Sequence, residues 1–163
     1  MNLKQKIADF LASGLYVGKI PLAPGTVGTL IAIPIMFLYW EKGVLAQIFI
    51  TISVFLIGFW ASTVVVGDTS NTEEKVDPDF VVIDEIAGFL VSMIGISLTP
   101  IHLLIAFVLF RVYDIFKPPP IKKFEQLPSG LGIMADDVIA GIYVLIIMHI
   151  LVKFFNIYDK FRF

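Results

Sequence analysis

The stretch VLAQIFITISVFLIGFWASTVVV, residues Val44–Val66, carries no charged side chain and decides the fold class. A helix needs about 20 predominantly apolar residues to cross the hydrocarbon core of a bilayer, and this run is longer. The rest of the 163-residue chain has the same character: 58% of its residues are hydrophobic, 16% are charged, and the mean hydropathy is +0.90. That balance is too apolar for a soluble domain. The sequence therefore predicts an integral membrane protein.

The apolar segments around this run predict an all-α fold, a multi-pass membrane helical bundle of about five apolar helices in one domain over residues 1–163. The apolar helices are expected at residues 26–40, 44–66, 80–98, 101–116 and 137–155. An N-terminal amphipathic helix is expected before them, lying at the membrane interface, because apolar residues recur there at helical spacing. Its apolar stripe comprises Ile7, Phe10, Leu11, Gly14 and Leu15.

The order of these segments predicts that the polar motifs meet on one membrane face. Five spans and a cytoplasmic N-terminus place the residues before Thr26 and the loops at 67–79 and 117–136 on the cytoplasmic side. Basic residues favour this orientation, because positive charge concentrates in cytoplasmic loops. Those inside would be Lys4, Lys6, Lys19, Lys75, Arg111, Lys117, Lys122 and Lys123, against Lys42, Lys153, Lys160 and Arg162 outside. The charged motifs are expected roughly 5 to 10 Å below this interface, within reach of a phospholipid phosphate.

Adjacent carboxylates at Asp84 and Glu85 interrupt an apolar helix. An ionisable residue inside a membrane segment is costly and is by default a functional candidate. Gly88, one turn after Asp84, leaves room for a ligand or another helix. Carboxylate oxygens suit Mg²⁺, which takes one or two of them and completes its shell with water and substrate phosphate. Asp79 lies close enough to join this candidate magnesium site. The other acidic residues of that loop are expected to be solvated: Asp68, Glu73, Glu74 and Asp77.

Arg111, Asp114 and Lys117 recur every three residues and so share one side of a helix. An ion pair between Arg111 and Asp114 would lower the cost of burying both side chains. The guanidinium group presents a fork of donors that matches phosphate oxygens, and the lysine ammonium supplies a point charge for the same group. The motif therefore predicts a phosphate-binding helix end.

Two other segments place glycine beside polar residues near a predicted helix start. In the first, Lys19 precedes Gly25 and Thr26, which suit an anion site or an ordinary helix cap formed by Thr26. In the second, Asp136 and Asp137 follow a glycine turn and lead into the last helix. The helix dipole stabilises a carboxylate at such a position, so capping accounts for one of them. Two in succession indicate a metal site.

Four ordered strings resemble those of bacterial phosphatidylglycerophosphatase A: PLAPGTVGT at 21–29, DEIAG at 84–88, FRVYDIFKP at 110–118 and GIMADDVIAG at 132–141. The resemblance covers roughly residues 15 to 145, and the order and spacing of all four strings make it specific. One departure is Ser129, where the family has glycine more often. The resemblance implies a Mg²⁺-dependent, multi-pass phosphatase of the bacterial inner membrane. Such an enzyme hydrolyses phosphatidylglycerophosphate to phosphatidylglycerol and inorganic phosphate.

The same resemblance implies roles for the polar residues. The carboxylates that would hold one or two Mg²⁺ ions are Asp84, Glu85, Asp136 and Asp137. These ions would neutralise the terminal phosphate and lower the pKa of an attacking water. The residues that would bind the phosphate are Arg111, Lys117, Lys19, Gly25 and Thr26. Asp114 could orient Arg111, bind metal or act as general base, and the nucleophile is either water or an aspartate.

A small ion-coupled transporter or channel subunit is the alternative, because short helices beside ionisable residues suit that class too. Against it, the charges cluster toward one face and leave no polar path along Val44–Val66.

The chain has no cysteine, which excludes cysteine-dependent phosphatase chemistry. It also lacks a basic surface large enough for nucleic acid. His102 and His149 lie in apolar sequence and are expected to pack or to lie at the interface rather than to catalyse.

Overall fold

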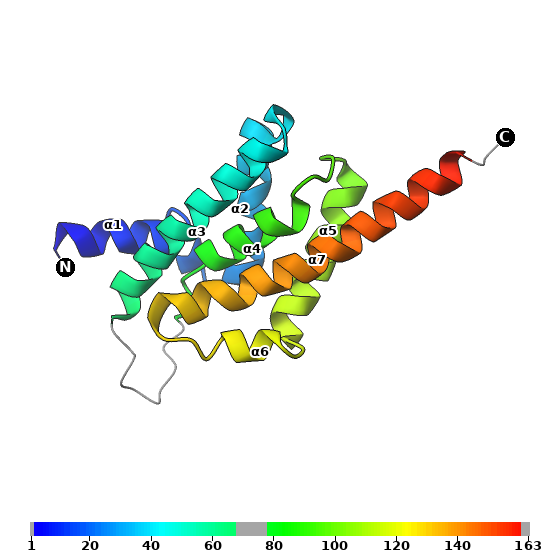
Figure 1. Ribbon diagram of the computed structural model, residues 1–163. Helices are drawn as coiled ribbons and strands as arrows, with labels where there is room; N and C mark the ends of the chain where they lie inside the picture. Colours follow the sequence, from blue (N-terminus) through cyan, green and yellow to red (C-terminus); the bar gives the residue numbers. More distant parts are fainter. Residues whose placement is uncertain (1, 68–77, 161–163) are drawn as a thin grey trace.

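The computed structural model describes residues 2–67 and 78–160, with side chains described as far as Phe154. Regular structure in this part of the chain is helical throughout, which confirms the predicted all-α class (Figure 1). The helices are α1 (Leu3–Ala12), η1 (Val17–Lys19), α2 (Pro24–Tyr39), η2 (Trp40–Lys42), α3 (Val44–Val66), α4 (Ile83–Met93), α5 (Pro100–Phe116), α6 (Ile121–Phe124) and α7 (Ser129–Lys160). The acidic residues predicted to be solvated, Asp68, Glu73, Glu74 and Asp77, lie outside the described residues, as does Lys75.

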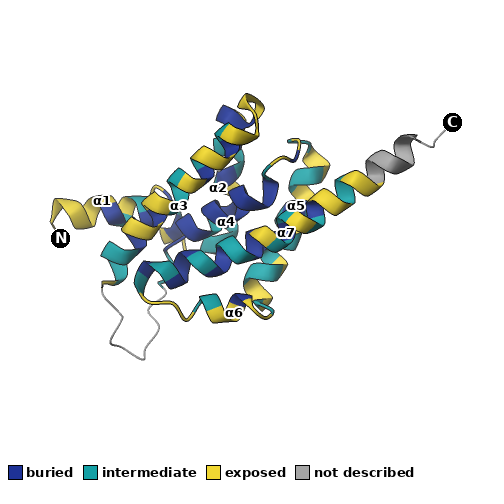
Figure 2. Ribbon diagram, viewed as in Figure 1, coloured by how far each residue is buried: buried dark blue, intermediate teal, exposed yellow. Residues whose placement is uncertain are grey.

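Helix α4 is the centre of the bundle, and α2, α3, α5 and α7 all pack against it. All of its residues except Glu85 are buried (Figure 2). This helix is much shorter than the one predicted at residues 80–98, since only the 11 residues of Ile83–Met93 are helical. At 1.5 Å per residue α4 is about 16 Å long, too short for the roughly 30 Å core of a bilayer. Its C-terminal end precedes Gly95, which has a φ of 76° and turns the chain toward α5.

Among the described residues, two helices are long and apolar enough to cross a membrane: Val44–Val66 and the Ser129–Phe154 part of α7. Only 22% of the most apolar 18-residue window of the first helix is buried and 28% of that of the second, whereas the core helix of a soluble protein would be mostly buried. The exposed apolar side chains of α7 recur every four residues: Ile142, Ile146, Ile150 and Phe154. A continuous apolar surface of this kind is typical of contact with lipid or with another protein.

The predicted count of five apolar helices is not confirmed. Helix α2 has 16 residues and α5 has 17, so both fall short of the length that spans a bilayer without tilt or thinning. The last helix, in contrast, is longer than predicted. It begins at Ser129, eight positions before the predicted start at residue 137.

Helices α4 and α7 cross closely at two glycines, Gly88 and Gly141. A Cβ added to Gly141 would overlap the carbonyl oxygen of Gly88, and one added to Gly88 would lie 2.6 Å from the carbonyl oxygen of Asp137. The space that the sequence indicated beside Gly88 is therefore filled by another helix. Asp84 precedes Gly88 by one turn and Asp137 precedes Gly141 by one turn. The crossing thus sets how closely these two carboxylates approach each other.

The N-terminal helix is confirmed, but its contact face differs from the predicted stripe. Ala8 and Ala12 are fully buried where α1 packs against α3, because small side chains allow the two helices to approach. Ile7 and Phe10 are exposed instead. The helix ends at Ala12, before Gly14 and Leu15, both of which have positive φ values.

Candidate functional site

A cavity of about 340 Å³ lies where four helix ends converge. The beginnings of α2, α4 and α7 meet the end of α5, so motifs far apart in the sequence face one space. The lining residues are Ala23, Pro24, Gly25, Thr26, Pro78, Asp79, Val81, Asp84, Glu85, Arg111, Asp114, Lys117, Asp136 and Asp137. Six carboxyl groups and two cations thus surround the cavity, which gives it a strongly negative formal charge when all are ionised.

Asp84, Glu85 and Asp137 form a compact carboxylate cluster. One oxygen from each lies within 4.8 Å of the others. Asp84 and Asp137 are buried, and Oε2 of Glu85 is buried without a hydrogen-bond partner among the described residues. Like charges this close in a low-dielectric site are costly unless a cation or a proton compensates them. Hard carboxylate oxygens at this spacing fit Mg²⁺, so the residues present suit the predicted metal.

Asp136 does not belong to this cluster, although the sequence placed it among the metal ligands. Its Oδ2 accepts a 2.6 Å hydrogen bond from Nζ of Lys117, and its Oδ1 accepts one from the backbone N–H of Asp137 at 3.0 Å. Both aspartates lie about two turns inside α7, not at its N-terminus. Stabilisation by the helix dipole is confined to the first turn, so dipole capping accounts for neither.

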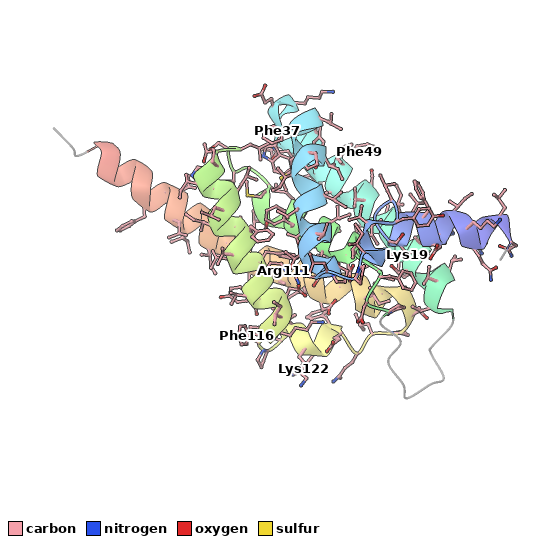
Figure 3. The ribbon with its side chains drawn as sticks, turned by 180° about the vertical axis from the view of Figure 1, so that it is seen from behind. Lys19, Phe37, Phe49, Arg111, Phe116 and Lys122 are labelled. Atoms are coloured by element: carbon pink, nitrogen blue, oxygen red, sulfur yellow. The ribbon has the colours of Figure 1, made fainter. Side chains whose placement is uncertain are left out.

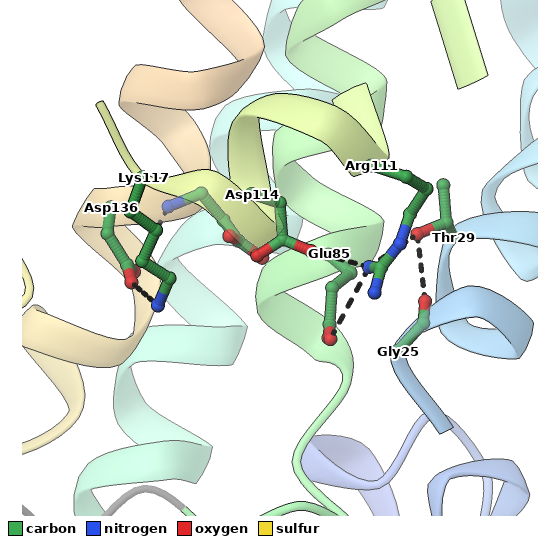
Figure 4. Close-up of polar contacts among 8 residues, drawn as sticks. Gly25, Thr29, Glu85, Arg111, Asp114, Lys117 and Asp136 are labelled. Carbon is green, nitrogen blue, oxygen red and sulfur yellow. Dashed lines mark hydrogen bonds and ion pairs between the residues drawn. The ribbon is translucent and has the colours of Figure 1, made fainter. Parts of the chain in front are cut away.

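Arg111 reaches into the cavity from α5 and pairs with Asp114 (Figures 3 and 4). Nη1 of Arg111 lies 2.6 Å from Oδ2 of Asp114, which confirms the predicted ion pair. The same nitrogen lies 3.9 Å from Oε1 of Glu85, so Arg111 also borders the carboxylate cluster. Its guanidinium group thus lines the cavity beside the cluster, and a guanidinium group can bind an anion such as phosphate.

Thr29 of α2 is a site residue to which sequence reasoning assigned no role. It is fully buried, donates a 2.8 Å hydrogen bond to the carbonyl of Gly25 and accepts one from Nη1 of Arg111 at 3.4 Å. The signals in the sequence were its place at the end of the motif at residues 21–29 and a hydroxyl one turn after Gly25 in a largely apolar helix. Because threonine often bonds to its own helix in this way, that signal alone does not identify a site residue.

The beginning of α2 lies directly against this ion-pair system. Helix α2 starts at Pro24 and its N-cap residue is Ala23, so the predicted capping role of Thr26 is wrong. A Cβ on Gly25 would overlap Oε1 of Glu85 and lie 3.1 Å from both terminal nitrogens of Arg111. Glycine is therefore required here by close approach.

Replacing Gly25 with alanine is expected to lower the phosphatase activity that the sequence resemblance implies by about a hundredfold, while leaving the fold intact. The added methyl group displaces only the ends of two long side chains, which costs little stability, but a shift of about 1 Å in catalytic groups has large kinetic effects. Steady-state kinetics and thermal unfolding of purified protein in detergent check this result. Leu30→Ala, on the exposed side of the same helix, is the control and should keep full activity. Equal activity of Gly25→Ala and the unaltered protein would contradict the prediction.

Lys117 ends α5 in a left-handed conformation, with a φ of 41°, and turns its ammonium group toward α7. Nζ contacts Asp136 at 2.6 Å and Oε1 of Glu125 at 3.1 Å. Burial lowers the pKa of Lys117, but the hydrogen bond and charge of Asp136 outweigh it, so the pKa is raised above its ordinary value. Lys117 therefore stays positively charged at neutral pH.

Other predicted or considered residues lie elsewhere. Lys19 does not line the cavity; it forms an ion pair with Asp9 of α1 at 2.5 Å. His102 and His149 form hydrogen bonds within their own segments, and neither lines the cavity. Each histidine lies at least nine residues along its helix from the nearest cavity residue, about 13 Å or more at 1.5 Å per residue. The cavity thus contains all the predicted site residues except Lys19.

Comparison with known proteins places this site in a family. Residues 10–152 match the profile of the family described as Phosphatidylglycerophosphatase A. The chain is 37% identical over 144 residues to Phosphatidylglycerophosphatase A of Haemophilus influenzae, covering 85% of this chain and 84% of that protein. It is 33% identical over 139 residues to Phosphatidylglycerophosphatase A of Escherichia coli, covering 81% and 76%.

A third relative is a Bacteroides thetaiotaomicron protein named "Putative phosphatidylinositol-3-phosphatase", 30% identical over 151 residues and covering 85% of this chain and 89% of that protein. No solved structure matches the chain. The profile match includes the whole carboxylate cluster together with Arg111 and Lys117. The protein therefore belongs to the phosphatidylglycerophosphatase A family.

Proposed function

We propose that this protein is a Mg²⁺-dependent phosphatase that converts phosphatidylglycerophosphate to phosphatidylglycerol and inorganic phosphate. The carboxylate cluster of Asp84, Glu85 and Asp137, which shares one cavity with Arg111 and Lys117, carries the proposal. The names of two relatives supply the substrate. Over the whole reaction one water is consumed: the bond from phosphorus to the glycerol oxygen breaks, the glycerol oxygen takes up a proton, and the remaining hydroxide ends on the released phosphate. The group that first attacks phosphorus is either water or an aspartate.

The charges around the cavity support dependence on a divalent cation. Six carboxyl groups outnumber two cations there, so a phosphomonoester dianion would be repelled without added positive charge. Asp84, Glu85 and Asp137 would hold Mg²⁺, which supplies charge neutralisation and Lewis acidity toward the phosphate. Arg111 and Lys117 would contact the phosphate oxygens, where negative charge is redistributed in the transition state. Asp114 would keep the guanidinium group of Arg111 oriented through their ion pair.

We place the enzyme in the bacterial inner membrane as a multi-pass protein with its cavity at the cytoplasmic face. Exposed apolar side chains on α2, α3, α5 and α7 support membrane contact; Phe37, Phe49 and Phe116 project from three different helices (Figure 3). The cavity lies where helix ends meet, and its lining residue Lys117 contacts Glu125, which directly follows α6 with its exposed Lys122. Basic residues near these helix ends favour the cytoplasmic side. The lipid could then keep its acyl chains in the bilayer while its phosphate enters the cavity.

Purified protein in detergent is expected to release inorganic phosphate from phosphatidylglycerophosphate, to lose this activity with a chelator, and to regain it with excess Mg²⁺. Parallel assays with phosphatidylinositol 3-phosphate test the substrate, because one relative is named for that lipid. Faster phosphate release from phosphatidylinositol 3-phosphate would identify that lipid as the preferred substrate. No release from either lipid would favour the ion-coupled transporter instead.

A further inference from the structure

We propose that the neighbouring carboxylates Asp136 and Asp137 have different tasks: Asp137 binds the divalent cation, whereas Asp136 positions Lys117 for the phosphate. This assignment deepens the proposed function and rests on it. It also changes the role expected for Asp136, which the sequence grouped with the metal ligands. Consecutive residues of a helix point about 100° apart, so adjacency alone does not decide whether two carboxylates share a ligand. Asp84 and Glu85 meet in one cluster, whereas Asp136 lies outside the cluster that contains Asp137.

The contacts of Asp136 account for both of its oxygens. Oδ2 accepts the 2.6 Å hydrogen bond from Lys117, and Oδ1 accepts the 3.0 Å hydrogen bond from the N–H of Asp137. Glu85, in contrast, has one buried oxygen without a hydrogen-bond partner among the described residues. A metal ligand needs an available oxygen lone pair directed at the ion. Asp136 uses its oxygens for other contacts, and it lies outside the cluster that Asp137 completes.

The contacts of Lys117 also support a positioning role for Asp136. A lysine ammonium is a mobile point charge on a flexible stem, so it places its charge accurately only where neighbours restrict it. Asp136 and Glu125 approach Nζ from α7 and from the segment between α6 and α7. This arrangement, shown for Asp136 in Figure 4, keeps the ammonium at the cavity wall. Glu125 is therefore a second positioning residue, although it does not line the cavity.

Binding of Mn²⁺ to purified protein in detergent, measured by electron paramagnetic resonance, separates the two tasks without reference to turnover. Asp137→Asn is expected to weaken Mn²⁺ binding by at least about a hundredfold. Asp136→Asn should change it by no more than about tenfold, the lower end of the effect expected for a residue outside the ligand shell. The amide oxygen introduced by Asp136→Asn can still accept the hydrogen bond from the N–H of Asp137, so the local geometry of α7 is retained. Equal loss in both variants would overturn the proposal.

Kinetics with Lys117→Gln supply the second test. If Asp136 acts through Lys117, Asp136→Asn should lower kcat/KM by about 10- to 100-fold in the unaltered protein. In a Lys117→Gln background it should lower kcat/KM by no more than about twofold, because contacting residues are strongly non-additive. Full additivity of the two changes would overturn the assignment. Glu125→Gln should raise KM by several-fold and leave Mn²⁺ affinity unchanged.

The outcomes for this assignment and for the proposed function are distinguishable. If the unaltered protein releases no phosphate from either lipid, the proposed function fails, while the Mn²⁺ comparison still decides between the two aspartates. If it releases phosphate and Asp136→Asn abolishes Mn²⁺ binding, the enzyme assignment holds and the division of tasks fails.

Discussion

Glu85→Gln is expected to abolish phosphate release, and Asp84→Asn and Asp137→Asn should have the same effect. Each change keeps the size of the side chain but replaces a charged oxygen ligand with an amide group. The cluster has only three carboxylates within 4.8 Å of one another, and the two that remain cannot replace a lost ligand. Losing one therefore weakens both cation binding and charge neutralisation at the phosphate. The loss should exceed the roughly 10- to 100-fold effect of changing a residue outside the ligand shell. Phosphate release at saturating Mg²⁺ is the measurement.

These variants should remain folded and membrane-inserted, because removing one of several crowded like charges relieves repulsion in the protein without bound metal. Thermal unfolding and size-exclusion chromatography in detergent check this. His149→Ala is the matched control: His149 lies on the same helix as Asp137, far from the cavity, and its change should leave activity largely intact. An inactive His149→Ala variant that remains folded would contradict the role given to the histidines. Normal activity of the Glu85→Gln variant would contradict the role of the carboxylate cluster in catalysis.

Gly141→Val is expected to reduce both stability and activity strongly. Any Cβ at residue 141 meets the carbonyl oxygen of Gly88, which is backbone and cannot swing aside. Helices α4 and α7 must therefore separate, and overpacking of this kind costs about 1–3 kcal/mol or more. The separation also moves Asp137 away from Asp84, and a displacement of about 1 Å can lower turnover by about a hundredfold. Thermal unfolding and phosphate release, measured on the same preparation, check the two effects.

A graded series distinguishes crowding from a general effect of mutating α7. Gly141→Ala should fall between the unaltered protein and Gly141→Val in both measurements. Ile146→Ala, on the exposed side of α7, should leave both almost unchanged. A Gly141→Val variant as stable and active as the unaltered protein would show that the close crossing does not set the geometry of the cluster.

The fold class was predictable because it follows from local composition. Long apolar segments without charge predict helices, and the helix at Val44–Val66, which is long enough to span a bilayer, followed from its own composition. Helix lengths were less predictable, as α4 shows. Apart from Asp84, Glu85 and two serines, apolar residues and glycine continue from Phe80 to Leu98, but this run includes the chain on either side of a short helix. An apolar residue that is buried within the protein and one that faces lipid have the same sequence signature.

Helix boundaries at the site were also mispredicted, for a local reason. The sequence suggested a helix start at Asp137, after the glycines of residues 130–132, but α7 starts at Ser129. Ser129 has a φ of 54°, a conformation that glycine adopts without strain, which agrees with the glycine expected there from the sequence resemblance. Glycines within the first turn of α7 are tolerated because Gly130 and Gly132 lie against backbone atoms of neighbouring segments. Those tertiary contacts are not visible in the sequence.

The sequence by itself determined the chemistry of the protein: which charged residues interrupt apolar segments, and the four motifs that link the chain to its family. Only the tertiary structure decided how those residues are grouped. It brought Asp84, Glu85 and Asp137 together, joined Asp136 to Lys117 and turned Lys19 toward Asp9. The physical reason is that a charged residue in an apolar segment is visible in the sequence, because burying a charge is costly. Which side chain pairs with that charge depends instead on how the helices cross and how each is rotated about its axis. Those are set by contacts such as Gly88 with Gly141, which lie far apart in the chain.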